Sequence, residues 1–389
     1  MEKKSKEIWI VAGESSGDIY GARLANELRA QEPGIKIAGM GGHHMRDAGV
    51  EIMVDSSELG VIGLIEVLEN IFKFIKILLF MKREAARVRP DAVVLIDYPG
   101  FNIRYAKMLW SLGIPVIWYI SPQVWVWRKS NIPKLAKYCR KMMVIFPFEP
   151  DVYKGTGLDA EFVGHPLVEV VRGRVDASIN RDPKRVVLLP GSRKSETSRL
   201  FVPMLQTVAL LHARHPELKF AVAAARPKVA ADLKQILAKF KQANPSLKLP
   251  EFDLEPGQTS RWLQEGATGF AASGTITVEC AIAGLPLVVI YKLNPLTFLF
   301  ARLIIKKLFR GFFTMVNIIA DKCVFEEYLQ HQLVPEDLAA AVERILPGGT
   351  RRQEVETEMG KVVAALSGGS EGASANAARA CLEVIKAAK

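Results

Sequence analysis

Two short polar stretches in the second half of the 389-residue chain combine the residue types that bind phosphates. Each follows an apolar run and precedes a helical pattern, so backbone N–H groups and a helix N-terminus would face a bound anion. The first stretch contains Gly191, Ser192, Arg193 and Glu196, and the second contains Ser273, Gly274 and Thr275. Either stretch alone fits an ordinary strand-to-helix turn equally well. Together, in this order, they indicate a diphosphate site.

Glu279 adds a sugar-binding group to the second stretch. It follows Thr275 by one helical turn, where its carboxylate can accept hydrogen bonds from both hydroxyls of a ribose. Ser273 and Thr275 would then address the phosphates. The pattern predicts a nucleotide-sugar site in the C-terminal half of the chain.

The N-terminal half offers carboxylates and hydroxyls of a different kind. Glu14, Ser16 and Asp18 follow the first apolar run in a stretch that lacks both the G-x-G-x-x-G spacing of dinucleotide-binding folds and the G-K-[ST] ending of a P-loop. They could orient a donor or an acceptor, although helix N-capping explains Ser16 and Asp18 equally well. Asp97 ends the run 93–96 and is expected at the carboxyl edge of a sheet, where it is a candidate general base or a cap of the following turn.

The elements that would position these residues alternate as in parallel α/β proteins. Apolar runs expected to form a first sheet are 8–12, 36–40, 92–97, 115–120, 142–146 and 161–164, and those of a second sheet are 185–190, 219–225, 247–249, 268–272 and 286–291. Ligands bind at the carboxyl ends of such strands. The sequence therefore predicts two doubly wound domains.

The expected domains are a first one over 1–170, a linker over 171–184, a nucleotide-binding domain over 185–345 and terminal helices over 346–389. The terminal helices could cross back to the first domain. The linker is placed where a polar stretch without periodicity follows Gly164-His165-Pro166.

The net charge of +11 is concentrated in segments 70–90, 128–141 and 292–310. No nucleic-acid module is found, and two of these segments lie in strongly apolar sequence, so nucleic acid is not expected as a partner. Residues 68–81 and 296–313 carry lysines and arginines too often for a spanning helix and are predicted to rest on an anionic membrane surface. A core helix with a basic, solvated edge is the alternative.

The ends and the cysteines of the chain give expectations about its compartment. The apolar stretch 8–12 is too short for a signal peptide, so the protein is expected in the cytoplasm. Four scattered cysteines, Cys139, Cys280, Cys323 and Cys381, have no metal-ligand spacing and are expected to be reduced packing residues. No metal or cofactor is predicted.

Several strings resemble the lipid A disaccharide synthase family, from the first apolar run to about residue 330. They are Ala12 to Asp18, Gly63 to Leu68, Asp97-Tyr98-Pro99, Phe101-Asn102, Tyr119 to Arg128, Phe162 to His165, Leu189 to Glu196 and Ala272 to Glu279. The resemblance is specific, because Ala-Gly-Glu-x-Ser-Gly-Asp and Ser-Pro-x-Val-Trp-x-Trp-Arg occur together and in the family's order.

The resemblance implies a GT-B glycosyltransferase, with two Rossmann-like domains facing a central cleft. It further implies a peripheral enzyme on the inner face of the inner membrane, and a homodimer is possible. The implied reaction joins UDP-2,3-diacylglucosamine to 2,3-diacylglucosamine 1-phosphate (lipid X), releases UDP and forms a β-1,6 disaccharide. Trp127 and Arg128 would meet the acceptor. Another UDP-sugar enzyme, such as an epimerase or an undecaprenyl-linked transferase, and a non-catalytic nucleotide-binding protein of the membrane surface are the alternatives.

The chain departs from the family pattern at two places that concern the site. Gly100 stands where the family usually has a second aspartate after Asp-x-Pro, so Asp97 alone is expected as the base. Asn317, a predicted UDP-binding residue, is kept, but Lys322 replaces an arginine. A lysine does not offer the bidentate phosphate contact of an arginine.

Overall fold

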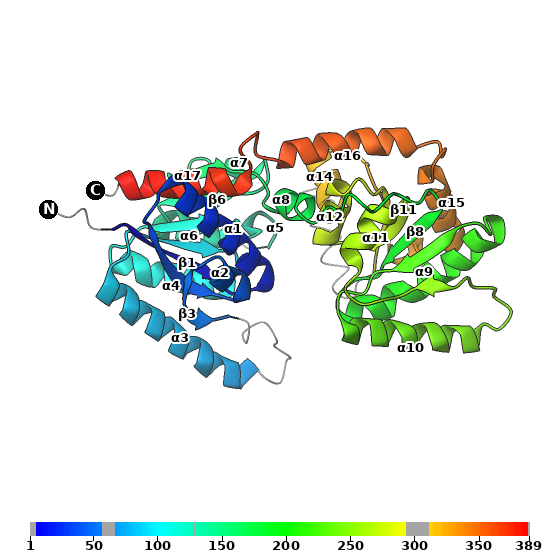
Figure 1. Cartoon of the computed structure of the whole chain (residues 1–389), viewed down its shortest axis with the longest axis horizontal. Coiled ribbons are helices and arrows are strands. Elements are labelled where there is room, and N and C mark those ends of the chain that lie inside the picture. The colour runs from blue at the N-terminus through cyan, green and yellow to red at the C-terminus, as the bar shows by residue number, and fades with distance from the viewer. Residues whose placement is uncertain (1–4, 57–66, 128, 293–310, 388–389) are drawn as a thin grey trace. The chain divides into compact units, whose positions relative to one another are not determined.

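The computed structural model describes residues 5–56, 67–127, 129–292 and 311–387 (Figure 1). The chain folds into two compact units. Unit 1 holds residues 1–166 and 366–389, and unit 2 holds residues 167–365. Each unit is built around one parallel sheet with helices on both faces, which is the α/β architecture expected from the sequence.

The sheet of unit 1 has seven parallel strands in the order β3-β2-β1-β4-β5-β6-β7. Their bounds are β1 Glu7–Ala12, β2 Lys36–Gly41, β3 Glu51–Asp55, β4 Ala92–Ile96, β5 Val116–Tyr119, β6 Lys141–Val144 and β7 Asp159–Phe162. The central strands are apolar on both faces because helices cover both faces of the sheet. In β1, Trp9 and Val11 belong to the buried hydrophobic cluster on one face, while the alternating residues Ile8 and Ile10 are buried on the opposite face.

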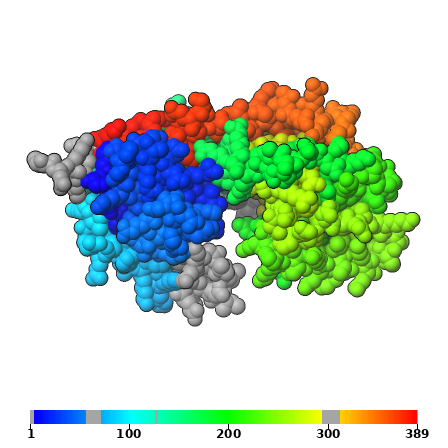
Figure 2. All heavy atoms as spheres, viewed as in Figure 1, coloured from blue at the N-terminus to red at the C-terminus, as the bar shows by residue number. Residues whose placement is uncertain are grey.

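The helices of unit 1 fill the crossovers between these strands. Their bounds are α1 Ser15–Gln31, α2 His43–Asp47, α3 Val67–Val88, α4 Pro99–Ser111, α5 Val124–Trp127, the 3₁₀ turn η1 Lys129–Asn131, α6 Ile132–Tyr138, α7 Glu149–Tyr153 and α17 Ala373–Ala387. The last of them, α17, comes from the far end of the chain and packs against α1. Figure 2 shows these C-terminal residues in red against the blue N-terminal residues.

The return of the chain to unit 1 is fixed by polar contacts. The buried Asn376 donates from Nδ2 to the carbonyls of Val163 (3.0 Å) and Gly368 (2.7 Å). The largely buried Lys141 on β6 pairs with Glu161 at 2.7 Å and reaches Glu383 of α17 at 3.9 Å. Residues 366–389 are therefore an integral part of unit 1.

The sheet of unit 2 has six parallel strands in the order β10-β9-β8-β11-β12-β13. Their bounds are β8 Arg185–Leu189, β9 Lys219–Val222, β10 Phe252–Asp253, β11 Thr268–Ala272, β12 Leu287–Tyr291 and β13 Glu326–Leu329. The helices are α8 Leu167–Arg172, α9 Lys194–Arg214, α10 Pro227–Ala243, α11 Thr259–Glu265, α12 Thr275–Ile282, α14 Met315–Ala320, the 3₁₀ turn η2 Gln330–Gln332, α15 Pro335–Ile345 and α16 Arg352–Leu366.

Three edge strands differ from the sequence expectation. The run 247–249 forms no strand, and the edge is made instead by the two residues of β10. Strands β3 and β13 were not expected, since neither is a buried apolar run: β3 is only partly buried, and β13 reads Glu-Glu-Tyr-Leu. Edge strands bury one side only, which weakens the hydrophobic signal.

Both sheets reverse their strand order at one point, and there the loops of two neighbouring strands diverge. In unit 1 the reversal lies between β1 and β4, where Ala12 pairs with Ile96. In unit 2 it lies between β8 and β11, where Ala271 pairs with Leu189. We call each of these two reversals a switch point. The candidate residues follow β1, β4, β8 and β11, so they all lie at the two switch points.

Candidate nucleotide and catalytic sites

The two predicted phosphate turns lie next to each other at the switch point of unit 2. One follows β8 and the other follows the neighbouring strand β11. Ser192, Arg193, Gly274 and Thr275 are exposed, and Gly274 is the N-cap of α12. The hydroxyl of Ser273 reaches the carbonyl of Phe313 at 3.5 Å. This edge presents two helix N-termini, those of α9 and α12, to one region, an arrangement that favours a bound diphosphate.

Gly191 and Glu196 fix the shape of the first turn. Gly191 has φ +103, and a Cβ there would come within 2.6 Å of the Glu196 carboxylate. Glu196 accepts a hydrogen bond from the Ser192 N–H at 3.3 Å and pairs with Arg193 at 3.1 Å. In this geometry the Glu196 carboxylate contacts Ser192 and Arg193, and its predicted part in UDP binding stays a prediction.

Glu279 lies one turn into α12 and lines a cavity of about 340 Å³ inside unit 2. Burial raises the pKa of its carboxyl group, while the charge of Arg174 lowers it. In the part of the chain that the structure describes, no group donates a hydrogen bond to this carboxylate. Glu279 is partly buried, and a ribose diol placed beside it would donate hydrogen bonds to its carboxylate.

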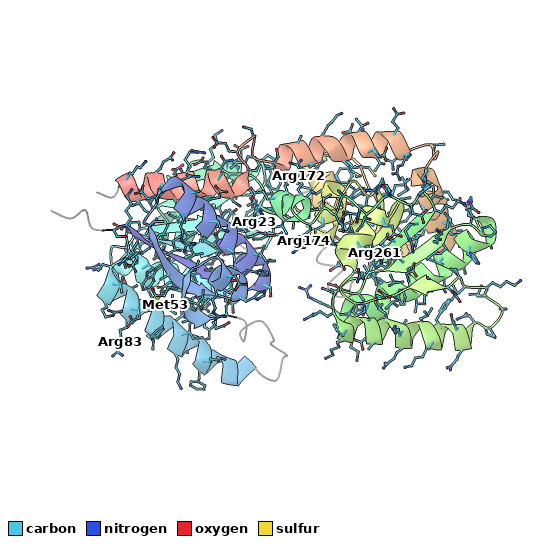
Figure 3. The ribbon with its side chains drawn as sticks, in the orientation of Figure 1. Arg23, Met53, Arg83, Arg172, Arg174 and Arg261 are labelled. Atoms are coloured by element: carbon cyan, nitrogen blue, oxygen red, sulfur yellow. The ribbon has the colours of Figure 1, made fainter. Side chains whose placement is uncertain are left out.

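The cavity also brings in a residue that the sequence did not single out. Arg174 follows α8, in the stretch 171–184 that was interpreted as a linker, and lines the cavity together with α11 and α12 (Figure 3). This stretch is tied to unit 2, because Arg181 donates to the carbonyl of Ala283 at 2.7 Å and Gln264 to the carbonyl of Arg174 at 3.1 Å. A basic residue in an aperiodic stretch gives no signal in the sequence alone.

The prediction that Asn317 binds UDP is not supported by its surroundings. Asn317 is completely buried, its Nδ2 donates to Phe325 O and Glu327 Oε1, and its Oδ1 accepts from the N–H groups of Val324 and Phe325. These four bonds use every donor and acceptor of the amide. Asn317 holds the start of β13 against α14 and has no group left for a phosphate.

Asp97 ends β4 at the switch point of unit 1 and is partly buried. The pKa of Asp97 is raised to about 6, first by burial of the carboxyl group and then by the negative charge of Glu14, which follows β1. A hydrogen bond from the Tyr98 backbone lowers the pKa and offsets part of this increase. A carboxyl group with this pKa is ionised at neutral pH and still basic enough to take a proton. The neighbouring strands β1 and β4 thus bring Glu14 within electrostatic range of Asp97.

The backbone around Asp97 is held in an uncommon conformation. Asp97 (φ +43) and Tyr98 (φ +45) are both left-handed, which costs energy for residues other than glycine and is frequent at functional sites. The buried Asn102 stabilises this turn by donating to the carbonyls of Ile96 (3.1 Å) and Asp97 (2.8 Å). The Tyr98 ring lies over Gly13, where a Cβ would come within 2.2 Å of it.

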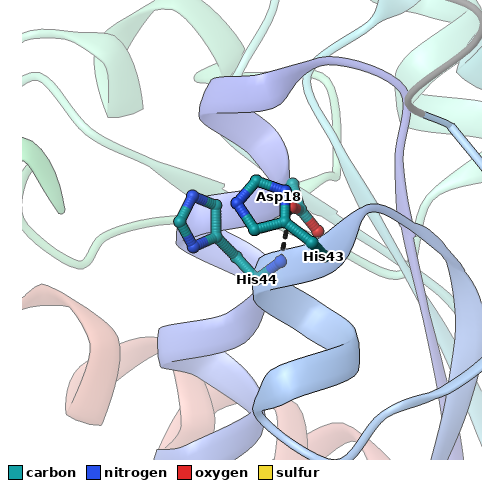
Figure 4. A group of neighbouring side chains, drawn as sticks. All are labelled: Asp18, His43 and His44. Atoms are coloured by element: carbon teal, nitrogen blue, oxygen red, sulfur yellow. Dashed lines mark hydrogen bonds between the residues drawn. The ribbon is translucent and has the colours of Figure 1, made fainter. Parts of the chain in front are cut away.

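Asp18 has a structural role that competes with substrate orientation. It is buried, and its carboxylate accepts hydrogen bonds from the N–H groups of Gly42 (2.7 Å), His44 (3.0 Å) and Met45 (3.1 Å) (Figure 4). It therefore caps α2, a helix different from its own. His43 and His44 lie beside it, and one ligand atom of each of the three residues falls within 4.8 Å of the others. Ser16, by contrast, is exposed.

The aromatic stretch after β5 is anchored from α7. The buried Glu149 accepts from the Trp125 indole at 3.2 Å and from the N–H groups of Ile145 and Phe146, and burial raises the pKa of Glu149 to about 7. Trp125 is thereby a packing residue. The side chain of Trp127 and all of Arg128 lie outside the described part of the structure, as does most of 296–313.

Helix α3 leaves an apolar stripe in solvent. Phe72 (69% exposed), Ile75 (45%) and Leu79 (55%) recur at helical spacing, whereas Leu78 and Met81 on the other side are buried in the core. Lysines and arginines surround the stripe. None of the helices among the described residues has the length and hydrophobicity to cross a bilayer.

Comparison with known proteins agrees with this arrangement. The family model of lipid-A-disaccharide synthetase matches residues 8–381. The lipid-A-disaccharide synthase of Anaeromyxobacter dehalogenans (strain 2CP-1 / ATCC BAA-258) is 37% identical over 388 residues, which cover 98% of both chains.

Solved structures resemble the chain in fold at low identity. The kitacinnamycin glycotransferase aligns with a TM-score of 0.66 at 15% identity, over 98% of this chain and 100% of its own. UDP-GlcNAc 2-epimerase from Neisseria meningitidis, bound to UDP-GlcNAc, aligns with a TM-score of 0.63 at 12% identity, over 98% and 100%. The fold is thus GT-B, and the sequence match over nearly the whole chain shows that the protein belongs to the lipid-A-disaccharide synthase family, a family of glycosyltransferases in lipid A biosynthesis.

Proposed function

We propose that the protein transfers the diacylglucosamine of UDP-2,3-diacylglucosamine to the 6-hydroxyl of 2,3-diacylglucosamine 1-phosphate, giving a β-1,6 disaccharide 1-phosphate and UDP. The observation that carries the proposal is the pair of switch points. One presents Asp97, a carboxylate with a pKa raised to about 6, and the other presents two phosphate turns, with the partly buried carboxylate of Glu279 one turn into α12. These are the groups that sugar transfer from a nucleotide needs.

The reaction requires a single displacement at C1 of the donor sugar. The acceptor's 6-oxygen forms a bond to C1 as the bond from C1 to the diphosphate oxygen breaks, and UDP leaves with the electron pair. Asp97 accepts the proton of the attacking hydroxyl. The N–H groups of 191–193, Arg193 and the N-terminus of α12 stabilise the charge on the leaving diphosphate.

The remaining groups bind and orient the substrates. Glu279 accepts the ribose hydroxyls, and Ser273 and Thr275 contact the phosphates. Glu14, the N-cap residue of α1, and Ser16, in the first turn of α1, orient the reacting sugars. Trp127 and Arg128 remain candidates for contact with the acceptor phosphate.

The acylated substrates also require a lipid surface, and α3 suits one. Its exposed apolar stripe, flanked by Lys73, Lys76 and Arg83, matches the pattern of a helix lying in an anionic membrane interface. We assign the protein to the cytoplasmic face of the inner membrane as a peripheral enzyme. Burial of the same stripe in a homodimer is the competing outcome, which sedimentation equilibrium of the detergent-free protein separates from membrane binding.

Release of UDP from synthetic monosaccharide substrates in detergent micelles tests the reaction. We expect UDP and disaccharide in equal amounts from UDP-diacylglucosamine only when the acceptor is present, and little from UDP-GlcNAc. A sugar epimerase would convert its UDP-sugar without any acceptor and without releasing UDP as a stoichiometric product. That result, or release that does not depend on the acceptor, would refute the proposal.

A further inference from the structure

The side chain of Tyr98 connects the turn that carries Asp97 to the loop after β1. Its ring lies against Gly13, since a Cβ added at Gly13 would overlap the ring atoms Cγ, Cδ1 and Cε1. Glu14 is the next residue along the chain. The backbone therefore passes the tyrosine ring one residue before the carboxylate whose charge acts on Asp97.

The Tyr98 ring is itself held in place from α4. Tyr98 is the N-cap residue of this helix and is left-handed (φ +45), and its carbonyl accepts the N–H of Asn102 at 3.0 Å. The ring stacks with that of Phe101 at 6.1 Å, and Phe101 is completely buried in the core of unit 1. Tyr98 is thus a partly buried wall between the core and the loop at Gly13.

Asp97 responds electrostatically to what this wall holds. From β5, the carbonyl of Tyr119 accepts the N–H of Asp97 at 3.0 Å, and from the turn, the backbone of Tyr98 bonds to its carboxylate. Among the described residues, the charge that acts on Asp97 comes from Glu14. Burial and then the same Glu14 carboxylate raise the pKa of the Tyr98 phenol. Glu14 therefore lies near both residues, and its effect on Asp97 falls as their separation grows.

We propose that Tyr98 is a positioning residue, whose ring packs against Gly13 and thereby holds Glu14 at a fixed distance from Asp97. The inference rests on the proposed use of Asp97 as the base. The ring acts by packing, so its hydroxyl group is not needed, whereas the lack of a side chain at Gly13 is. Without the contact, Glu14 is free to move away, and the pKa of Asp97 falls.

Two measurements on the full chain test the inference. Carbon-13 NMR of aspartate-labelled protein, with the Asp97 signal assigned by its loss in Asp97→Asn, gives the pKa directly, and the acidic limb of kcat/KM reports it in turnover. We expect Tyr98→Ala and Gly13→Ala to lower the pKa below about 6 and to move the limb to lower pH. On the plateau, kcat should fall by about tenfold, because a weaker base takes a proton less readily.

The control variants separate the ring contact from general damage. Tyr98→Phe keeps the ring and should titrate as the wild type does. The same is expected of Tyr138→Ala, at a partly buried tyrosine of α6, and of Gly360→Ala, where a Cβ would meet no described atom within 4 Å. Thermal unfolding checks that each variant is folded, and Tyr98→Leu replaces Tyr98→Ala if the alanine variant is not.

A double-mutant cycle distinguishes positioning from simple burial, because loss of the ring also exposes Asp97 to water. If Tyr98 acts through Glu14, Tyr98→Ala lowers the pKa of Asp97 less in the Glu14→Gln protein than in the wild type. Equal shifts in the two backgrounds would overturn the inference. So would a Tyr98→Ala protein that titrates normally, or a Tyr98→Phe protein that titrates like Tyr98→Ala.

The inference and the proposed function fail separately. If the NMR titration shifts as expected while the acidic limb of kcat/KM stays in place, Tyr98 has the positioning role and Asp97 is not the base. If the limb follows the pKa in every variant, both stand.

Discussion

Three carboxylates that the sequence marks as candidates lie in three different environments. Asp18 accepts three backbone hydrogen bonds and is fully used in capping α2. Asp97 is partly buried and close to a like charge, so it holds its proton more strongly than an ordinary aspartate. Glu279 is partly buried, and none of the residues that the structure describes donates a hydrogen bond to its carboxylate. Residue type alone gives all three the same weight. Their environments differ, and on that basis we propose that they act as a cap, a base and a ligand contact.

The role of Asp97 predicts a selective loss of turnover. Asp97→Asn removes the proton acceptor but keeps the size of the side chain, so we expect kcat to fall by about a hundredfold or more while UDP binding in unit 2 stays unchanged. The exposed Asp151→Asn on α7 is the matched control and should keep full activity. Steady-state kinetics and UDP calorimetry measure the two effects, and an Asp97→Asn enzyme with normal kcat excludes Asp97 as the base.

The influence of Glu14 on Asp97 predicts a shift in the pH profile. A base works only when ionised, so kcat/KM should fall as the pH drops through about 6, the raised pKa of Asp97. Glu14→Gln removes a charge that raises this pKa, and the acidic limb should therefore move to lower pH. The exposed Glu51→Gln on β3 serves as the control. If Glu14→Gln leaves the acidic limb in place, the limb reports a group other than Asp97.

At the scale of elements, the two faces of α3 perform different tasks. Leu78, Met81 and Ala85 close the core of unit 1, and the opposite side exposes Phe72 and Leu79. A solvated helix gains nothing by exposing such residues, which favours a surface that binds apolar material.

Polar replacement of the stripe should therefore weaken lipid binding. For Phe72→Ser combined with Leu79→Ser we expect partitioning onto phosphatidylglycerol vesicles to fall by about tenfold or more, since each buried apolar side chain contributes roughly 1.5–3 kcal/mol. Leu247→Ser, at a 40% exposed leucine of unit 2, is the control. Vesicle sedimentation provides the measurement. Unchanged partitioning of the double variant would show that α3 does not carry the interaction.

Helix α17 should contribute to the stability of unit 1 and not to nucleotide binding. Asn376→Ala leaves the carbonyls of Val163 and Gly368 without their donor, at a cost of about 1–3 kcal/mol in the free energy of unfolding. Arg379→Ala on the same helix removes only the exposed ion pairs with Glu161 and Glu383 and should cost less than about 1 kcal/mol. Urea unfolding measures both costs. Loss of UDP affinity in Asn376→Ala would contradict this separation.

At the scale of the whole molecule, the same architecture is used twice for different chemistry. Both units reverse strand order at a central pair of strands, and in each the polar loops lie after that pair. In the function that we propose, the loops of unit 1 supply the base and the orienting groups, whereas those of unit 2 supply helix N-termini and the carboxylate that binds the ribose. The sheet only decides where loops converge, and the loop residues decide which reaction step they serve.

The sequence by itself determined the alternation of strands and helices, the family and the two phosphate turns. These features are local, because hydrophobic runs, glycine positions and short motifs are written in consecutive residues. The central strands were identified since they are buried on both faces, and the edge strands β3, β10 and β13 were missed since one-sided burial leaves a weak pattern.

The contacts between residues that are distant in the chain were decided only by the tertiary structure. It placed Glu14 near Asp97, brought Arg174 and Glu279 into the lining of one cavity, and returned residues 366–389 to unit 1. It also engaged the side-chain amide of Asn317 with Val324, Phe325 and Glu327. Burial, electrostatic coupling and hydrogen-bond satisfaction are properties of neighbours in space, and no spacing along the chain encodes them.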